Sequence, residues 1–379
     1  MTISIIGSGA AGITSATLLS ADESNDVYLF TSDKSKFNLD EGFDQDITQS
    51  CFGVEYTRYQ KIFLSSNVTL AGHSETSILS QSDIILFCLP VHAIQDIATK
   101  FTPAILEYPN KSKFVGSIYG QGNFNLLVPK ALYDANNINL FAFAFIPWIT
   151  KMRPERTTST YINGVENFNL IYLQYLENKT ISSLSCQLLS KLSIEKVDYE
   201  FTQYATEVAL ASDNMLLHPP RLISCFGRLY EKSEIPSFYR DYGQAEQMLF
   251  NLVEDELNNL KQHIKRFERH LDLNFLISMS EFEKLANSPS FTINSYVKKN
   301  HTTSARIPVC KANPTHYKLD TSCRYFKDDF THGLHYVQHL ARHYGVSVPA
   351  IDEILRWYHI NIKPLPSKPY FTDRPTLFN

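Results

Sequence analysis

The first residues with a chemical role in this chain are three glycines, Gly7, Gly9 and Gly12, at G-x-G-x-x-G spacing. They follow an isoleucine-rich run at residues 3–6 and precede a helix-compatible segment at residues 13–19. Gly7 allows a tight strand-to-helix turn, Gly9 lets the backbone approach a pyrophosphate, and Gly12 lets helix and strand pack closely. A helix N-terminus also presents free N–H groups and a partial positive charge to phosphates. The spacing therefore predicts a dinucleotide site, and a glycine-rich turn without a ligand is the alternative.

The residues after the second expected strand, at residues 26–30, indicate which dinucleotide is bound. An NAD site usually has Asp or Glu about 20 residues beyond the glycines, to bind the ribose 2′-hydroxyl. Here Thr31 and Ser32 end the strand and Lys34 follows, which favours the 2′-phosphate of NADP over NAD. Asp33 is the competing candidate, as a ribose ligand or a turn residue.

A third contact with the cofactor is expected after the apolar strand at residues 84–89, which ends at Pro90. This arrangement recurs in nicotinamide dehydrogenases, although an ordinary central parallel strand has the same apolar residues. We interpret His92 as a loop histidine near the nicotinamide rather than a catalyst. The predicted cofactor contacts are Gly7, Ser8, Gly9, Ala10, Ala11, Gly12, Thr31, Ser32, Lys34 and Pro90.

The second half of the chain contains a histidine directly before two prolines, His218-Pro219-Pro220. Because a residue before proline avoids helical backbone, we expect His218 on a rigid, non-helical segment at a helix end. Two uses of this histidine remain open from these residues alone. It is either a packed core or loop histidine, or a group that takes part in chemistry.

A further stretch, residues 323–334, contains Arg324 and Asp329. Alone it reads as a helix N-terminus with Asp329 near the cap and Arg324 on the surface. Four histidines follow at spacings of three and four residues and are expected on one helix face: His332, His335, His339 and His343. Zinc sites use such spacing, but no Cys, Asp or Glu ligand is evident nearby, so we predict a pH-sensitive face and no metal.

The elements that position these residues change in type along the chain. Strands alternate with helical segments up to residue 199, which predicts a doubly wound, mostly parallel α/β sheet of the Rossmann type. Residues 159–162, 169–172 and 195–198 are expected to extend this sheet. From residue 200 to residue 379 helical periodicity prevails, at residues 201–217, 242–270, 329–344 and 351–357, before a proline-containing tail. We therefore expect two domains, residues 1–199 and 200–379.

Composition limits the class of protein. The 379 residues are 44% hydrophobic and 13% aromatic, enough for packed cores, and the net charge of -4 argues against nucleic-acid binding. The six cysteines include no C-x-x-C pair, and no apolar run is long enough to cross a bilayer. These features predict a cytoplasmic protein that associates with neither nucleic acid nor membrane.

The chain resembles the octopine/nopaline (opine) dehydrogenases over nearly its whole length. The resemblance depends most on N-x-x-x-H-P at Asn214 to Pro219 and R-Y-x-x-[DE]-D at Arg324 to Asp329, with support from the glycine turn, residues 120–124 and Pro147-Trp148. Metallophore opine enzymes share the H-P-P form. Two departures are clear: Asn123-Phe124 replaces the family's usual G-G-F, and residues 149–151 replace the Ala-Cys-Arg that usually follows Pro-Trp.

The resemblance implies reductive condensation of an amino acid with a 2-oxo acid, pyruvate or 2-oxoglutarate, using NADPH or NADH. It implies His218 as general acid–base, Asp329 as the carboxylate that orients it, Arg324 as the substrate-carboxylate ligand and Asn214 as a substrate contact. Such enzymes work as monomers or homodimers. A reductase of a simple 2-oxo or hydroxy acid, a flavoprotein and a non-catalytic dinucleotide-binding protein are the alternatives.

Overall fold

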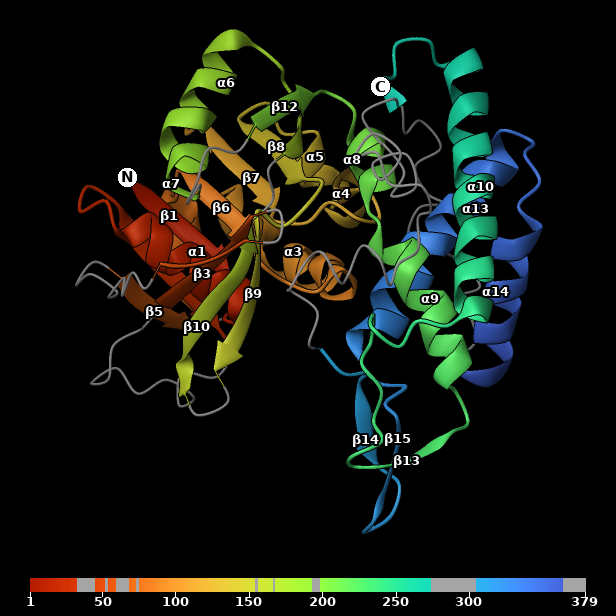
Figure 1. Cartoon of the computed structure of the whole chain (residues 1–379). Coiled ribbons are helices and arrows are strands. Elements are labelled where there is room, and N and C mark those ends of the chain that lie inside the picture. Colours follow the sequence, from red (N-terminus) through yellow and green to blue (C-terminus); the bar gives the residue numbers. More distant parts are fainter. Residues whose placement is uncertain are drawn as a thin grey trace. The chain divides into compact units, whose positions relative to one another are not determined.

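The structure is a computed structural model. It describes residues 1–32, 45–51, 54–58, 68–72, 75–153, 156–165, 168–192, 198–273 and 305–363. The chain divides into two compact units after Ala209 (Figure 1). Each unit has its own architecture.

The first unit is built on an eight-stranded sheet of order β12-β11-β8-β7-β6-β1-β2-β5. Every neighbouring pair is parallel except β11 with β8, which is antiparallel. The prediction of a mostly parallel, doubly wound sheet followed by a helical domain is confirmed. The strands are β1 (Thr2–Ile6), β2 (Asp26–Thr31), β5 (Val68–Gly72), β6 (Ile84–Phe87), β7 (Lys113–Ser117), β8 (Ile138–Phe143), β11 (Phe168–Leu173) and β12 (Asp198–Thr202).

Burial of both faces explains why the central strands read as continuous apolar runs. All residues of β6 and β8 are buried, as expected for parallel strands with packed layers on each side. The helices of this unit are α1 (Ala10–Ser20), α2 (Ser77–Gln81), α3 (Val91–Ile105), α4 (Phe124–Leu127), α5 (Lys130–Tyr133), α6 (Asn178–Leu184) and α7 (Ser190–Leu192), with a π-helical turn, Ser185–Leu189, between the last two. Side chains of β1, α1 and the α6–α7 segment share one hydrophobic core.

A second sheet in this unit corrects one expectation. Residues 159–162 do not extend the main sheet, because β10 (Arg156–Val165) pairs with β9 (Trp148–Arg153) and β3 (Gln45–Cys51). With β4 (Val54–Arg58) they form a four-stranded sheet. The Thr14 and Thr150 hydroxyls join α1 to β9 at 2.8 Å, and α1 is almost completely buried. β9 therefore packs against α1, and β10 pairs with β9 instead of extending the main sheet.

The second unit is mainly helical, with α9, α10, α13 and α14 drawn from green to blue in Figure 1. The expected helices at residues 242–270, 329–344 and 351–357 are present, although the second begins earlier and contains a long π-helical stretch. The helices are α8 (Ala205–Ala211) at the division, then α9 (Asn214–Cys225), α10 (Gln244–Phe267), η5 (Phe326–Leu334), α13 (His335–His343) and α14 (Pro349–Asn361).

The expected single helix at residues 201–217 is wrong at both ends. β12 occupies its start, and the helix breaks before Asn214. The expectation of non-helical backbone at His218 is also wrong, because α9 continues through Pro219 and Pro220 to Cys225. Residues 215–222 are all buried, and the Tyr242 hydroxyl donates to the Leu217 carbonyl at 3.0 Å. Tertiary packing thus overrides the local preference of the prolines.

The second unit also contains a small antiparallel sheet that the periodicity did not indicate, of order β13-β15-β14. Its strands, β13 (Leu229–Glu231), β14 (Val309–Lys311) and β15 (His316–Leu319), are too short to show alternation. Lys34, most of the expected strand at residues 195–198, and the proline-containing tail lie outside the described residues. Within the described ranges, no helix has the length and apolar character needed to cross a membrane.

Candidate active site

The glycine turn joins β1 to α1 in the first unit. Gly7 has a φ of 115°, a conformation that L side chains rarely adopt, and its N–H donates to the Phe30 carbonyl at 3.1 Å. Gly9 is the N-cap residue of α1 and makes no side-chain cap. The first N–H groups of α1 are thus left for an acceptor such as phosphate.

The three glycines are required for different reasons. A Cβ on Gly12 would lie 1.7 Å from the Gly7 carbonyl oxygen, and a Cβ on Gly7 would lie 2.5 Å from the Cys88 carbonyl oxygen. A Cβ on Gly9 would have nothing within 4 Å. Gly7 and Gly12 are therefore needed by the fold itself, whereas the open space at Gly9 fits the approach of a pyrophosphate.

This turn lies at the point where the order of the main sheet reverses. From β1 the chain proceeds through β2 to β5 on one side and through β6, β7 and β8 on the other. Ligands of open α/β sheets bind at such a switch point, beyond the carboxyl ends of the strands. The predicted contacts at those ends are Ser8, Thr31, Ser32 and Pro90.

The structure places these contacts as follows. The Ser8 hydroxyl donates to the Thr31 hydroxyl at 2.9 Å, so the turn after β1 is joined to the end of β2. Ser32 is exposed, and Pro90 is the half-buried residue at the start of α3. Ala10 and Ala11 form the first turn of α1.

The second unit holds a buried histidine between two polar groups. His218 lies in α9 and is only 2% exposed. Its Nδ1 is 2.7 Å from Oδ2 of Asp329 in η5, and its Nε2 is 3.0 Å from the Tyr239 hydroxyl. Because a carboxylate only accepts hydrogen bonds, Nδ1 carries a proton and donates it. The dyad of His218 and Asp329 thus has the arrangement of an acid–base group with its orienting carboxylate.

Aromatic rings surround the imidazole. Phe238 meets it edge-on, with centroids 5.0 Å apart, and Tyr325 lies tilted against it at 4.4 Å. Burial raises the pKa of Tyr239, and the charges of Tyr325, Asp213 and Asp329 raise it further, so its hydroxyl stays protonated at neutral pH.

Arg324 and Asn214, the predicted substrate contacts, lie near this group along the chain. The Arg324 guanidinium is over the Tyr325 ring at 5.4 Å from the centroid, and Tyr325 contacts His218. The residue is exposed, as the sequence suggested, so its donors can reach a ligand. Asn214 is the half-buried first residue of α9, one turn before His218. Asp329 lies in the first turn of η5, close to the N-cap residue Tyr325 as expected, and its side chain is buried.

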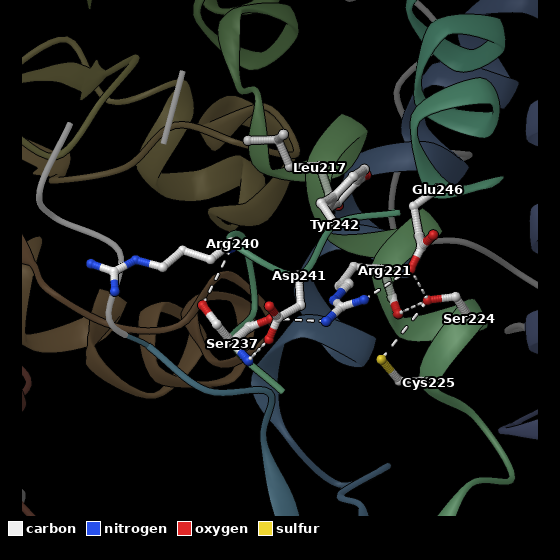
Figure 2. A network of polar contacts seen from close by, with 9 residues as sticks. All are labelled: Leu217, Arg221, Ser224, Cys225, Ser237, Arg240, Asp241, Tyr242 and Glu246. Carbon is white, nitrogen blue, oxygen red and sulfur yellow. Dashed lines mark hydrogen bonds and ion pairs between the residues drawn. The ribbon is translucent and has the colours of Figure 1, made fainter. Parts of the chain in front are cut away.

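A polar network that the sequence did not indicate joins α9 to Ser237 and Glu246 (Figure 2). Arg221 lies in α9 and is 4% exposed. It donates to Glu246 Oε1 and to the Ser237 carbonyl, both at 2.8 Å. The Ser224 hydroxyl donates to the same Glu246 oxygen at 2.7 Å. Burial opposes ionisation of Glu246, but the bonds from Ser224 and Arg221 lower its pKa overall. The segment carrying Tyr239 is thereby fixed to α9.

The four histidines expected on one helix face, His332, His335, His339 and His343, differ in their exposure to solvent. His335 is buried, His332 and His339 are half-buried and His343 is exposed. Burial, together with the charges of Arg342, His339 and His332, lowers the pKa of His335 to about 4. Among the described residues, no group of three or more His, Cys, Asp or Glu side chains is arranged to hold a metal ion.

Comparison with known proteins follows the same division of the chain. Residues 203–361 match the sequence model of the NAD/NADP octopine/nopaline dehydrogenase alpha-helical domain. No curated protein matches the chain. An octopine dehydrogenase with NADH and L-arginine has a similar fold, with a TM-score of 0.73 and 15% identity over 96% of this chain and 89% of that chain.

Two further solved structures are similar. Octopine dehydrogenase with NADH and pyruvate gives a TM-score of 0.67 at 15% identity, over 96% of this chain and 89% of that chain. Yersinopine dehydrogenase with NADP+ bound gives 0.60 at 14% identity, over 95% and 90%. At these identities the likeness establishes the shared fold.

Proposed function

We propose that the chain is an NAD(P)H-dependent opine dehydrogenase, because residues 203–361 match the sequence model of the NAD/NADP octopine/nopaline dehydrogenase alpha-helical domain. It joins the amine of an amino acid to a 2-oxo acid and reduces the resulting imine. The observation that carries this proposal is the buried contact of 2.7 Å between His218 Nδ1 and Asp329 Oδ2. The two residues are 111 positions apart in the chain.

Condensation requires a group that both accepts and donates protons near neutral pH. The amine must lose a proton when it attacks the 2-oxo carbon, and the oxygen must gain protons to leave as water. An imidazole can do both, and a carboxylate at Nδ1 fixes its tautomer and stabilises its protonated form. We assign these roles to His218 and Asp329.

The first unit fits a nicotinamide dinucleotide, as the open space at Gly9 and the uncapped start of α1 indicate. When bound, NAD(P)H supplies the hydride for the reduction. Gly7, Gly9 and Gly12 with Ser8, Ala10 and Ala11 would hold the pyrophosphate, and Thr31 and Ser32 would face the ribose. The hydroxyls of Thr31 and Ser32 favour NADPH, and the similar solved structures include complexes with NADH and with NADP+.

The substrates present two carboxylates, which require cationic or hydrogen-bonding partners. Arg324 is exposed and held over Tyr325, so its planar fork can bind a carboxylate in bidentate fashion. Asn214 is proposed to contact the substrate one helical turn from His218. Octopine dehydrogenase is described with L-arginine and with pyruvate, which makes an amino acid and a small 2-oxo acid the substrate classes to test.

The test is oxidation of NADPH and NADH, followed at 340 nm, with pyruvate or 2-oxoglutarate against a panel of amino acids. The panel includes basic, sulfur-containing and nicotianamine-like amines. Oxidation that requires both the amine and the oxo acid is the expected result. Oxidation with the oxo acid alone would mean a 2-oxo acid reductase, and silence despite NADPH binding would mean a binding protein.

A further inference from the structure

The buried position of His218 raises the question of how its proton reaches a substrate. Both ring nitrogens are engaged, Nδ1 by Asp329 and Nε2 by the Tyr239 hydroxyl. Phe238 and Tyr325 pack against the ring, and the residue is only 2% exposed. Tyr239 is half-buried, more open to solvent than the histidine to which it is bonded. The more accessible end of this chain of groups is therefore a phenol, not the imidazole.

We infer that Tyr239 is a further catalytic residue, whose hydroxyl passes protons between His218 Nε2 and the substrate. The inference rests on the proposed function. When the condensation adduct loses water, the Tyr239 O–H bond breaks as its proton moves to the departing oxygen. The Nε2 proton of the imidazolium moves to the Tyr239 oxygen at the same time. The C–O bond breaks, the nitrogen lone pair forms C=N, and His218 is left neutral.

The same hydrogen bond serves the opposite direction. With neutral His218, Nδ1–H donates to Asp329, so Nε2 offers a lone pair to the Tyr239 O–H. When the amine loses its proton to the Tyr239 oxygen, the hydroxyl proton passes to Nε2. Tyr239 thus remains a neutral phenol before and after each step, which avoids a charge on a half-buried group.

The backbone around Tyr239 is fixed well enough for this role. Arg221 joins the Ser237 carbonyl to the buried carboxylate of Glu246 (Figure 2). The Ser237 N–H also donates to Asp241 Oδ2 at 2.6 Å, which closes the loop around Tyr239. The Tyr242 hydroxyl bonds the carbonyl of Leu217, the residue before His218. Phe238 packs on both His218 and Tyr239 and limits their relative movement.

The variant that tests the relay is Tyr239→Phe, which keeps the ring and removes the hydroxyl. Tyr358→Phe is the matched control, because it makes the same change at a buried tyrosine of α14 that packs on Phe330. We expect Tyr239→Phe to lower kcat about 100-fold or more, with the KM for NADPH and the melting temperature unchanged. Tyr358→Phe is expected to keep the wild-type kcat.

The number of protons in flight separates a relay from a positioning role. Rates in H₂O–D₂O mixtures, with the amine and oxo acid pair found active, should give a curved two-proton dependence for wild type and a linear one for Tyr239→Phe. A lowered kcat with the curvature retained would mean that Tyr239 only positions His218 and would overturn the relay. Retention of more than half the wild-type kcat would overturn it as well.

A readout without turnover distinguishes failure of the relay from failure of the proposed function. In protein labelled with [¹⁵N]histidine, loss of the Tyr239 hydroxyl should move the His218 Nε2 resonance, and Tyr358→Phe should leave it in place. An unmoved resonance overturns the inference even in an active enzyme. If no substrate pair is turned over by wild type, the proposed function fails, and a moved resonance still supports the link between Tyr239 and His218.

Discussion

The glycine turn of the first unit and the histidine centre of the second prepare for chemistry in different ways. In the turn, backbone groups are expected to bind the ligand. The backbones of Gly7 and Gly12, five positions apart, must approach each other closely. In the histidine centre, side chains carry the function. His218 contacts Tyr239 and Asp329, which are 21 and 111 positions away in the sequence. The first site is encoded locally, whereas the second depends on how the helices pack.

The largest effect on kcat is expected from His218→Ala, which removes the imidazole of the histidine centre and leaves the glycine turn intact. Loss of the acid–base group should lower kcat by about 10²- to 10⁴-fold, with the Kd for NADPH nearly unchanged. Steady-state rates and NADPH fluorescence titration measure the two quantities. His343→Ala changes an exposed histidine of the same unit and serves as the control. More than about a tenth of the activity remaining would contradict the assignment.

A second buried histidine tests whether burial alone makes a useful acid–base group. His335 is 7% exposed, and burial, with Arg342 and two neighbouring histidines, lowers its pKa to about 4. Between pH 4 and the unfolded value near 6.5 the unfolded chain binds more protons, so stability falls as pH falls through this window. Urea unfolding should show a loss of about 1–2 kcal/mol for wild type from pH 7.5 to pH 5.

His335→Gln removes the titrating group and should remove that part of the pH dependence. An equal loss of stability in the variant would show that other groups titrate in this window. If the prediction holds, His335 stays neutral at physiological pH. Its charged neighbour is the Arg342 guanidinium, whereas His218 has the Asp329 carboxylate at 2.7 Å, and this difference in partners separates the two histidines.

The turn itself is tested by Gly12→Ala. The new Cβ would lie 1.7 Å from the Gly7 carbonyl oxygen, which is backbone and cannot rotate away. We expect a loss of about 1–3 kcal/mol in the free energy of unfolding, because overpacking forces strand and helix apart. Thermal unfolding of the purified variants measures it.

Gly9→Ala is the matched control for this clash. Its Cβ would meet nothing within 4 Å, and the φ of -78° suits alanine, so stability should be unchanged. NADPH affinity should still fall about tenfold or more, since the methyl group fills the space through which the pyrophosphate approaches. Equal destabilisation by both variants would mean that Gly9 has no separate role toward a ligand.

The same contrast explains what could be predicted from the sequence. The sheet followed from apolar runs and turn residues, and the glycine motif indicated its own contacts, because both depend on near neighbours. His218 and Asp329 were found only through the family resemblance, since no local rule joins residues 111 positions apart. Tyr239 and Arg221 have no motif, and the helix through Pro219 and Pro220 opposes local preference. Each of these depends on packing between distant segments.

The smallest effect concerns the network behind the centre and is expected from Arg221→Lys. Lysine keeps the charge opposite Glu246 but loses the planar fork, so it cannot also hold the Ser237 carbonyl. The segment with Tyr239 then loses one anchor, and kcat should fall about 3- to 10-fold with a stability change of about 1 kcal/mol or less. Arg356→Lys, which alters an exposed pair with Glu353, should have no effect on kcat. If Arg221→Lys matched its surface control, the network would support only the fold, and Tyr239 would owe its position to the aromatic packing around His218.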